Sequence, residues 1–142
     1  MTYFYQNNCI LNVERTSGAQ LDLQGPIFLY EPPRRVEFSN TSGGKVDCQA
    51  HGVPLPVLEW ILADGTTVTQ IKDMRLISGN GSLIFPPFPA EKFRRDVHAS
   101  VYRCIARNRV GLILSTDVFV KAEVEYHISL GWKENGWVFA AG

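Results

Sequence analysis

The sequence predicts one all-β sandwich domain over residues 25–124, and three observations favour this fold. Short runs rich in β-branched and aromatic residues follow one another, and no helical period of any length interrupts them. Turn-forming residues separate the runs at regular spacing: Pro32-Pro33, Ser42-Gly43-Gly44, Asp64-Gly65, Gly79-Asn80-Gly81, Pro86-Pro87 and Asn108 to Gly111. Short strands punctuated in this way are typical of a β-sandwich. The 142 residues suffice for one such domain.

Alternation of apolar and polar residues assigns a face to each expected strand, because successive side chains of a strand point to opposite sides. The residues expected to face inward are, in chain order, Val46, Cys48 and Ala50; Leu58, Trp60 and Leu62; Leu83 and Phe85; Tyr102, Cys104 and Ala106; and Leu112, Leu114, Val118 and Val120. Cys48 and Cys104 therefore face inward from different strands, and they can meet across the core of a sandwich.

Four of these residues form a more specific signature. Trp60 lies between Cys48 and Cys104 in the sequence, and Tyr102 stands two residues before the second cysteine. This order and spacing predict an immunoglobulin-like Greek-key sandwich, in which the cysteines bridge the sheets, the tryptophan packs on the bridge and the tyrosine forms a corner. A bridge that closes this loop would stabilise the fold by about 4 kcal/mol in the chain-entropy model. The alternative is a cytosolic sandwich with two buried free thiols.

Longer runs of the sequence resemble a known family. The runs are GPIFLYEPP (25–33), VEFSN (36–40), SLIFPPFPAEKFRRDVHASVYRCIARNRVG (82–111) and STDVFVKAEV (115–124). They closely resemble the first, N-terminal immunoglobulin domain of the arthropod Down syndrome cell adhesion molecule (Dscam) family. The resemblance implies an I-set domain whose first strand is kinked at Pro32-Pro33. One departure from the usual immunoglobulin pattern is His98, which stands where an Asp usually precedes Tyr102 by four residues.

Members of the Dscam family are neuronal cell-surface receptors with many immunoglobulin and fibronectin type III modules, a transmembrane helix and a cytoplasmic tail. By resemblance we expect an extracellular immunoglobulin domain that serves homophilic cell–cell adhesion and neuronal recognition, including axon guidance and dendrite self-avoidance. The expected partners are the same or a related Dscam-like receptor and the neighbouring immunoglobulin domains of one receptor. The alternatives are a soluble immune recognition protein and an intracellular structural immunoglobulin module.

Both ends of the chain differ from the expected domain. Residues 1–24 are mostly polar, show no recognisable signal peptide and are expected to be poorly ordered. Residues 125–142 do not resemble the start of a second immunoglobulin domain, and we interpret them as a truncated, read-through or linker tail. No apolar run is long enough for a transmembrane helix. We therefore expect a fragment of a longer receptor, located on the extracellular side of the plasma membrane.

Charge and motifs argue against catalysis and against nucleic-acid binding. The 14 basic and 14 acidic residues balance, which favours neither nucleic acid nor anionic membranes as partners. No catalytic or nucleotide-binding motif appears, so we expect no enzyme activity and no cofactor. His51, His98 and His127 fall on separate segments and predict no metal site. Cys9 has no partner base nearby and is expected to be a surface thiol.

Two groups of polar residues are candidates for modification or recognition. Asn40-Thr41-Ser42 and Asn80-Gly81-Ser82 fit the N-glycosylation rule in predicted turns, although Asn80 is also explained as a turn residue. A scattered basic set would suit an acidic or heparan-type partner, although solvated strand faces and loops explain it equally: Arg34, Arg35, Lys92, Arg94, Arg95, Arg103, Arg107 and Arg109.

The candidate interaction surface consists of Ile61, Ile105 and Ile113. These apolar residues are expected on the outward face of neighbouring strands, opposite the core. Exposed apolar patches often mark interfaces. The stripe would contact either a partner receptor or a neighbouring domain of the same chain, and in both cases the sequence predicts binding rather than chemistry.

Overall fold

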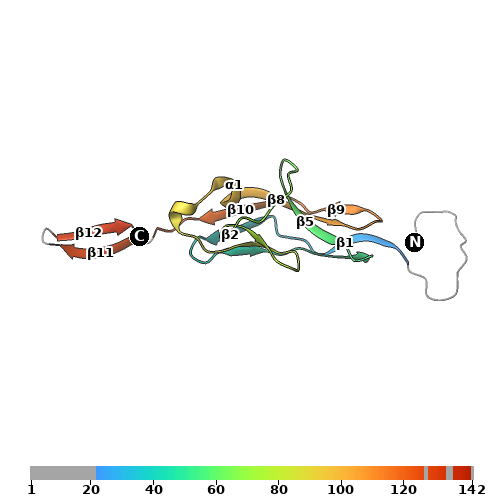
Figure 1. Cartoon of the computed structure of the whole chain (residues 1–142), viewed down its shortest axis with the longest axis horizontal. Coiled ribbons are helices and arrows are strands. Elements are labelled where there is room, and N and C mark those ends of the chain that lie inside the picture. Colours follow the sequence, from blue (N-terminus) through green and yellow to red (C-terminus); the bar gives the residue numbers. More distant parts are fainter. Residues whose placement is uncertain (1–21, 127, 134–135, 142) are drawn as a thin grey trace, which may run out of the picture.

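The computed structural model describes residues 22–126, 128–133 and 136–141 (Figure 1). Its strands are β1 (Gln24–Tyr30), β2 (Arg35–Ser39), β3 (Gly44–Val46), β4 (Gln49–Val53), β5 (Val57–Leu62), β6 (Leu76–Ile77), β7 (Leu83–Phe85), β8 (Ala99–Arg107), β9 (Leu112–Leu114), β10 (Val118–Glu123), β11 (Ile128–Lys133) and β12 (Gly136–Ala141). Two short helical segments precede β8: a 3₁₀ turn, η1 (Ala90–Lys92), and a single-turn helix, α1 (Arg95–His98).

Strands β1 to β10 form two facing layers. One sheet has the order β2-β10-β8-β5, and β9 also pairs with β8. The other layer consists of the pair β1-β4 and the three strands β3-β7-β6. Strands far apart in the chain lie side by side, as β5 does with β8 and β3 with β7. This architecture confirms the predicted all-β immunoglobulin-like sandwich.

The chain changes from one sheet to the other at Pro32-Pro33. Strand β1 pairs with β4, whereas β2 runs parallel to β10 in the other sheet. Proline has no N–H to donate, so two consecutive prolines interrupt a strand ladder. The carboxylate of Glu31 accepts a hydrogen bond from the backbone N–H of Thr116 at 2.9 Å, which holds the crossing in place. The kink implied by the resemblance is therefore present.

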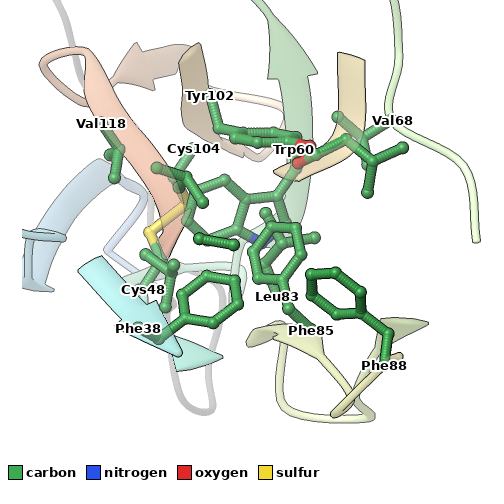
Figure 2. Close-up of a cluster of buried hydrophobic side chains, with 14 residues drawn as sticks. Phe38, Cys48, Trp60, Val68, Leu83, Phe85, Phe88, Tyr102, Cys104 and Val118 are labelled. Atoms are coloured by element: carbon green, nitrogen blue, oxygen red, sulfur yellow. Dashed lines mark hydrogen bonds between the residues drawn. A yellow bond between two sulfur atoms is a disulfide. The ribbon is translucent and has the colours of Figure 1, made fainter. Parts of the chain in front are cut away.

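The core surrounds a disulfide that joins the two layers. Cys48, between β3 and β4, is bonded to Cys104 of β8, with an S–S distance of 2.10 Å. Figure 2 shows the indole ring of Trp60 beside this disulfide. The indole N–H donates to the carbonyl of Gly81 at 2.6 Å, so the polar atom of this buried side chain has a partner.

Tyr102 forms the expected corner next to the disulfide. Its ring is fully buried and lies edge-on to the ring of Phe85, with centroids 5.7 Å apart. Its hydroxyl donates to the carbonyl of Val97 at 2.7 Å and accepts from the guanidinium of Arg75 at 3.3 Å. These bonds tie the α1 segment and the strand that begins after it to the chain around Arg75.

The structure corrects the predicted faces of β9. Val118 and Val120 of β10 are buried as expected, but Leu112 and Leu114 are about half exposed. The pairing along β8 explains the difference, because Ile105 pairs with Leu114 whereas Tyr102 pairs with Val118. The register thus shifts by one residue between β9 and β10. Such a bulge reverses the side-chain alternation that the sequence pattern assumed to be continuous.

Ser115 lies immediately before the bulge, still opposite Cys104, and is buried. Its backbone N–H donates to the carbonyl of Cys104 at 2.8 Å, and its hydroxyl accepts the N–H of Cys104 at 2.9 Å. A side-chain oxygen therefore takes the place of the backbone acceptor that the ladder lacks at this point. The bulge leaves the buried backbone groups of Cys104 satisfied.

The predicted tail contains a hairpin. Strands β11 and β12 pair antiparallel, from Ile128 with Ala141 to Lys133 with Gly136. The other predicted terminal segment, residues 1–24, lies outside the described residues except for its last three positions. Within the described parts of the chain, neither helix has the length and apolar character needed to cross a membrane.

Candidate interaction surface and modification sites

The candidate interaction surface that the sequence predicts corresponds to the solvent side of strands β5, β8 and β9. Trp60 pairs with Cys104, and both point into the core, so their strand neighbours point outward. We call this surface the outer face, and it consists of Val57, Glu59, Ile61, Arg103, Ile105, Arg107, Leu112 and Leu114. Apolar side chains from three strands therefore lie next to charged ones.

Two of the three predicted isoleucines belong to the outer face, and the third does not. Ile61 is partly buried, and Ile105 is only 8% exposed. Ile113 pairs with Ala106, whose side chain is buried in the core. Cross-strand partners share a face, so Ile113 lies on the core side of its sheet. The predicted stripe is wrong at this position.

Leu112 and Leu114 take the place of Ile113 on the outer face. They are 50% and 47% exposed, and Leu114 lies directly across from Ile105. The β-bulge between Ser115 and Val118 is the physical reason, because it places the β9 side chains on the face opposite the one that continuous alternation from β10 predicts. Sequence reasoning missed both leucines, since it extended one alternation across two strand segments.

The charged residues of the outer face form ion pairs, one within the face and one with Asp117 beside it. Arg107 contacts Glu59 at 3.5 Å, and Arg103 contacts Asp117 at 2.5 Å. Paired, partly exposed charges of this kind contribute little to stability. They can set the orientation of a partner, because an incorrectly placed like charge is repelled. The outer face therefore combines apolar area with a fixed charge pattern.

The scattered basic set converges only in part, at a pocket that Arg34 and Arg103 line together with Asp117. Arg35 pairs with Glu37, and Arg94 pairs with Asp96. The first pair lies on β2, which β10 separates from β8 in the same sheet, and the second lies at the start of α1. Among the described residues, no cluster of histidine, cysteine and acidic side chains is suited to a metal. His127 and Cys9 lie outside the described residues.

Asn40 is buried, unlike an ordinary turn residue. It is 2% exposed. Its amide Nδ2 donates to the carbonyl of Phe88 at 2.9 Å, and its Oδ1 accepts the backbone N–H of Glu125 at 2.5 Å. Its backbone N–H donates to the carbonyl of Glu123 at 3.0 Å. Asn40 therefore joins three segments, and a sugar on Nδ2 would require the bond to Phe88 to break.

Asn80 differs from Asn40 in its exposure and in the range of its contacts. It is exposed, and its Oδ1 accepts the backbone N–H of Ser82 at 3.2 Å and the hydroxyl of Ser78. These contacts hold the amide oxygen within its own turn. The turn is closed by the N–H of Gly81, which donates to the carbonyl of Ser78 at 3.0 Å.

His98 is a buried titratable group that the sequence pattern did not explain. Its ring stacks on Phe88 with centroids 3.8 Å apart, and its Nδ1 accepts the backbone N–H of Arg94 at 2.9 Å. Its Nε2 is buried with no hydrogen-bond partner among the described residues. Burial, together with the positive charges of Arg94 and Arg75, lowers the pKa of His98 below its usual value of 6.5.

Sequence comparison finds close relatives. The chain is 50% identical over 103 residues to the cell adhesion molecule Dscam1 of Drosophila melanogaster, covering 72% of this chain and 5% of the relative. It is 49% identical over 117 residues to Dscam2 of the same organism, covering 81% and 6%. Rattus norvegicus DSCAM is 39% identical over 95 residues, covering 67% and 5%. No family model matches the chain.

Solved structures agree with the sequence relatives. The N-terminal four immunoglobulin domains of Dscam1 isoform 7.44 match with a TM-score of 0.72 at 47% identity, covering 78% of this chain and 29% of the other. The N-terminal eight immunoglobulin domains of DSCAM isoform 1.30.30 match with a TM-score of 0.70 at 46% identity, covering 78% and 14%. A structure described as the structural basis for Dscam isoform specificity matches with a TM-score of 0.69, covering 76% and 28%.

Proposed function

Because this chain belongs to the Dscam family through its immunoglobulin domain, we propose that it is an extracellular binding module that contributes to homophilic cell–cell adhesion and neuronal recognition. The chain spans only 5–6% of the length of the two Drosophila relatives. The activity of a whole receptor, including axon guidance and dendrite self-avoidance, is therefore part of the proposal.

One observation carries the proposal: over 103 aligned residues, 72% of this chain, half are identical to those of a cell adhesion molecule. Fold alone would not suffice, since immunoglobulin-like sandwiches serve many functions. The same relatives favour adhesion over a soluble immune protein and over an intracellular structural module. They are adhesion molecules rather than enzymes, which supports the expectation that the domain binds and does not catalyse.

The outer face is the surface we assign to this binding. Leu112 and Leu114 expose apolar area beside Ile105, and the ion pair of Arg107 with Glu59 borders it. One face of one small domain buries too little surface for a tight complex. Many weak contacts between opposed membranes add up through multivalency. The partner is a like receptor or a neighbouring immunoglobulin domain of the same receptor.

The proposed location is the extracellular side of the plasma membrane, where the domain would be part of a longer receptor. The disulfide supports the extracellular side. Bridges such as Cys48–Cys104 form and persist in oxidising compartments and are rare in the cytosol. An intracellular module would keep these thiols reduced. The mass of the chain from native tissue, measured with and without reduction, distinguishes the two locations.

A bead assay tests the adhesive function. Beads that carry the chain at high density should aggregate, and Leu114→Glu should abolish aggregation because an unpaired charge would be buried in the interface. Ile27→Glu is the matched control, since Ile27 is as exposed as Leu114 but lies on β1 of the other sheet. Aggregation that survives Leu114→Glu, or beads that never aggregate, would contradict the assigned surface.

A further inference from the structure

A groove of about 500 Å³ opens at one edge of the sandwich, beside the turn that carries Asn80. Its lining is mainly apolar and comes from β1, the β4–β5 connection, β5 and β6, with Asn80 at its rim: Leu29, Leu55, Val57, Leu58, Ile77 and Asn80. Leu29, Leu55 and Val57 are 65%, 74% and 63% exposed. Exposed apolar side chains grouped in this way are unusual on a monomer surface.

The turn is anchored firmly to the groove. The carbonyl of Gly81 accepts the indole N–H of Trp60 from the core. A side chain at Gly81 would come within 2.7 Å of Leu58, and the positive φ of 94° there favours glycine. The hydroxyl of Ser82 donates to Asp47 at 2.6 Å. Asn80 is therefore held at the rim, with its Oδ1 engaged in the turn.

We propose that Asn80, and not Asn40, carries an N-linked glycan, and that its first N-acetylglucosamine residues lie over this groove. The inference rests on the proposed extracellular location. In the transfer, Nδ2 of Asn80 forms a bond to C1 of the sugar of a lipid-diphosphate-linked oligosaccharide. The C1–O bond breaks, the lipid diphosphate leaves with the electron pair, and the amide nitrogen loses one proton to a base of the transferring enzyme.

The chemistry of the groove suits this occupant. N-acetylglucosamine presents an acetamido methyl group and C–H faces, which can cover the side chains of Leu29, Leu55 and Val57. Its amide and hydroxyl groups can meet the polar rim formed by Gln49 and Ser78. The sugar is tethered at the groove, so its effective concentration there is high even if each contact is weak.

Asn40 provides the internal contrast. Its Nδ2 is buried and donates to the carbonyl of Phe88, so a sugar at this position is incompatible with the folded domain. Both positions satisfy the same sequence rule. The structure assigns them different roles, one as a tie between segments and the other as the modified site.

The first test is the intact mass of the full chain secreted from insect cells behind an added signal peptide. We expect one glycan, lost on treatment with peptide-N-glycosidase and absent from Asn80→Asp. This substitution keeps the Oδ1 acceptor of the turn, and it also reproduces the residue that the glycosidase leaves. A secreted chain without sugar at Asn80, or one with sugar at Asn40, would overturn the assignment.

The second test asks whether the glycan covers the groove. We expect amide exchange at Leu55, Val57 and Leu58 and binding of an apolar dye to rise after deglycosylation and in Asn80→Asp. A control moves the sugar: Asp64→Asn in the Asn80→Asp background creates the acceptor Asn-Gly-Thr in a turn outside the groove. A glycan at position 64 should not restore the protection of the groove from amide exchange.

The outcomes separate this inference from the adhesive function. Equal exchange and dye binding with and without the sugar at Asn80 would show that the glycan does not cover the groove. Protection that depends on protein concentration would assign the groove to a second copy of the chain, and would also overturn the inference. Failure of bead aggregation with a glycosylated, groove-protected chain would instead count against the adhesive function alone.

Discussion

The two faces of strand β8 carry alternate side chains of the same nine residues, yet these side chains differ in their burial and in their contacts. On the inner face, Tyr102, Cys104 and Ala106 are fully buried; Tyr102 donates to Val97 of α1, and Cys104 is bonded to Cys48 of the other layer. On the outer face, Arg103 and Arg107 form exposed ion pairs beside apolar side chains. The inner face therefore carries the stability of the domain, and the outer face is free to be used for binding.

The two asparagines that fit the N-glycosylation rule show the same contrast between a buried structural residue and an exposed one. Asn40 joins three backbone segments, whereas Asn80 contacts its own turn and the edge of a groove. The buried asparagine therefore stabilises the fold through its hydrogen bonds, whereas the side chain of the exposed asparagine is accessible for modification. Four experiments test how far this contrast between inside and outside extends.

Removing the disulfide should have the largest effect. In Cys48→Ala/Cys104→Ala the loop of 56 residues is no longer closed, and we expect the free energy of unfolding to fall by about 4 kcal/mol. Urea denaturation followed by tryptophan fluorescence measures this value. The wild-type chain in a reducing agent should behave like the variant, and an unchanged midpoint would show that the bridge does not stabilise the inner face.

Asn40→Ala should come next. The substitution leaves the carbonyl of Phe88 and the N–H of Glu125 without their partner, so the free energy of unfolding should fall by about 1–3 kcal/mol. Hydrogen exchange at the Glu125 amide should accelerate at the same time. The exposed Asn80→Asp should change the stability by no more than about 0.5 kcal/mol. Equal effects at both sites would remove the distinction drawn between them.

His98 should make the stability depend on pH. Its pKa in the folded state is lowered, chiefly by burial and then by the charge of Arg94, while Asp96 acts in the opposite direction and Arg75 adds to the lowering. The unfolded chain therefore binds a proton at higher pH than the folded one. Stability should be complete above about pH 6.5 and should fall as the pH drops below it, by at most about 1.4 kcal/mol per unit.

Denaturation midpoints between pH 5 and pH 8 measure this dependence. His98→Asn retains an acceptor for the N–H of Arg94 and should flatten the profile over this range. His51→Asn, at an exposed position, is the control and should leave the slope in place. An identical slope in both variants would exclude His98 as its source.

Leu114→Ala should have the smallest effect on stability, within about 0.5 kcal/mol, because the side chain is already half exposed. Val118→Ala, on the other side of the bulge, should cost about 2 kcal/mol because Val118 is fully buried. Continuous alternation would place both residues inward and predict comparable losses. The comparison of the two urea midpoints therefore tests the register shift directly.

Much of the core could be predicted from the sequence. The alternation places Trp60, Tyr102 and the two cysteines correctly in the core. An inward strand face needs an apolar residue at every second position, and this period can be read directly from the sequence. The inward residues of β7 and β10 follow the same rule and are buried as predicted. The resemblance to the Dscam family rests on longer runs of residues, and the comparisons bear it out.

The outer face could not be predicted equally well. Continuous alternation puts Ile113 and the two β9 leucines on the wrong sides because one inserted residue between Ser115 and Val118 inverts it, and a bulge has no periodic signal. The hydroxyl of Ser115 that accepts the N–H of Cys104 is recognisable only once the strands are paired. The groove beside Asn80 cannot be predicted from the sequence either, since its walls come from four separate parts of the chain.

The sequence by itself determined the sandwich, its bridging cysteines and the family, because these depend on residue type, order and period along the chain. The tertiary structure alone decided which asparagine is accessible, which β9 side chains face solvent, and where apolar residues gather into a groove. The physical reason is that burial and hydrogen bonding depend on partners distant in the chain, such as Phe88 and Glu125 for Asn40, and no local pattern specifies those partners.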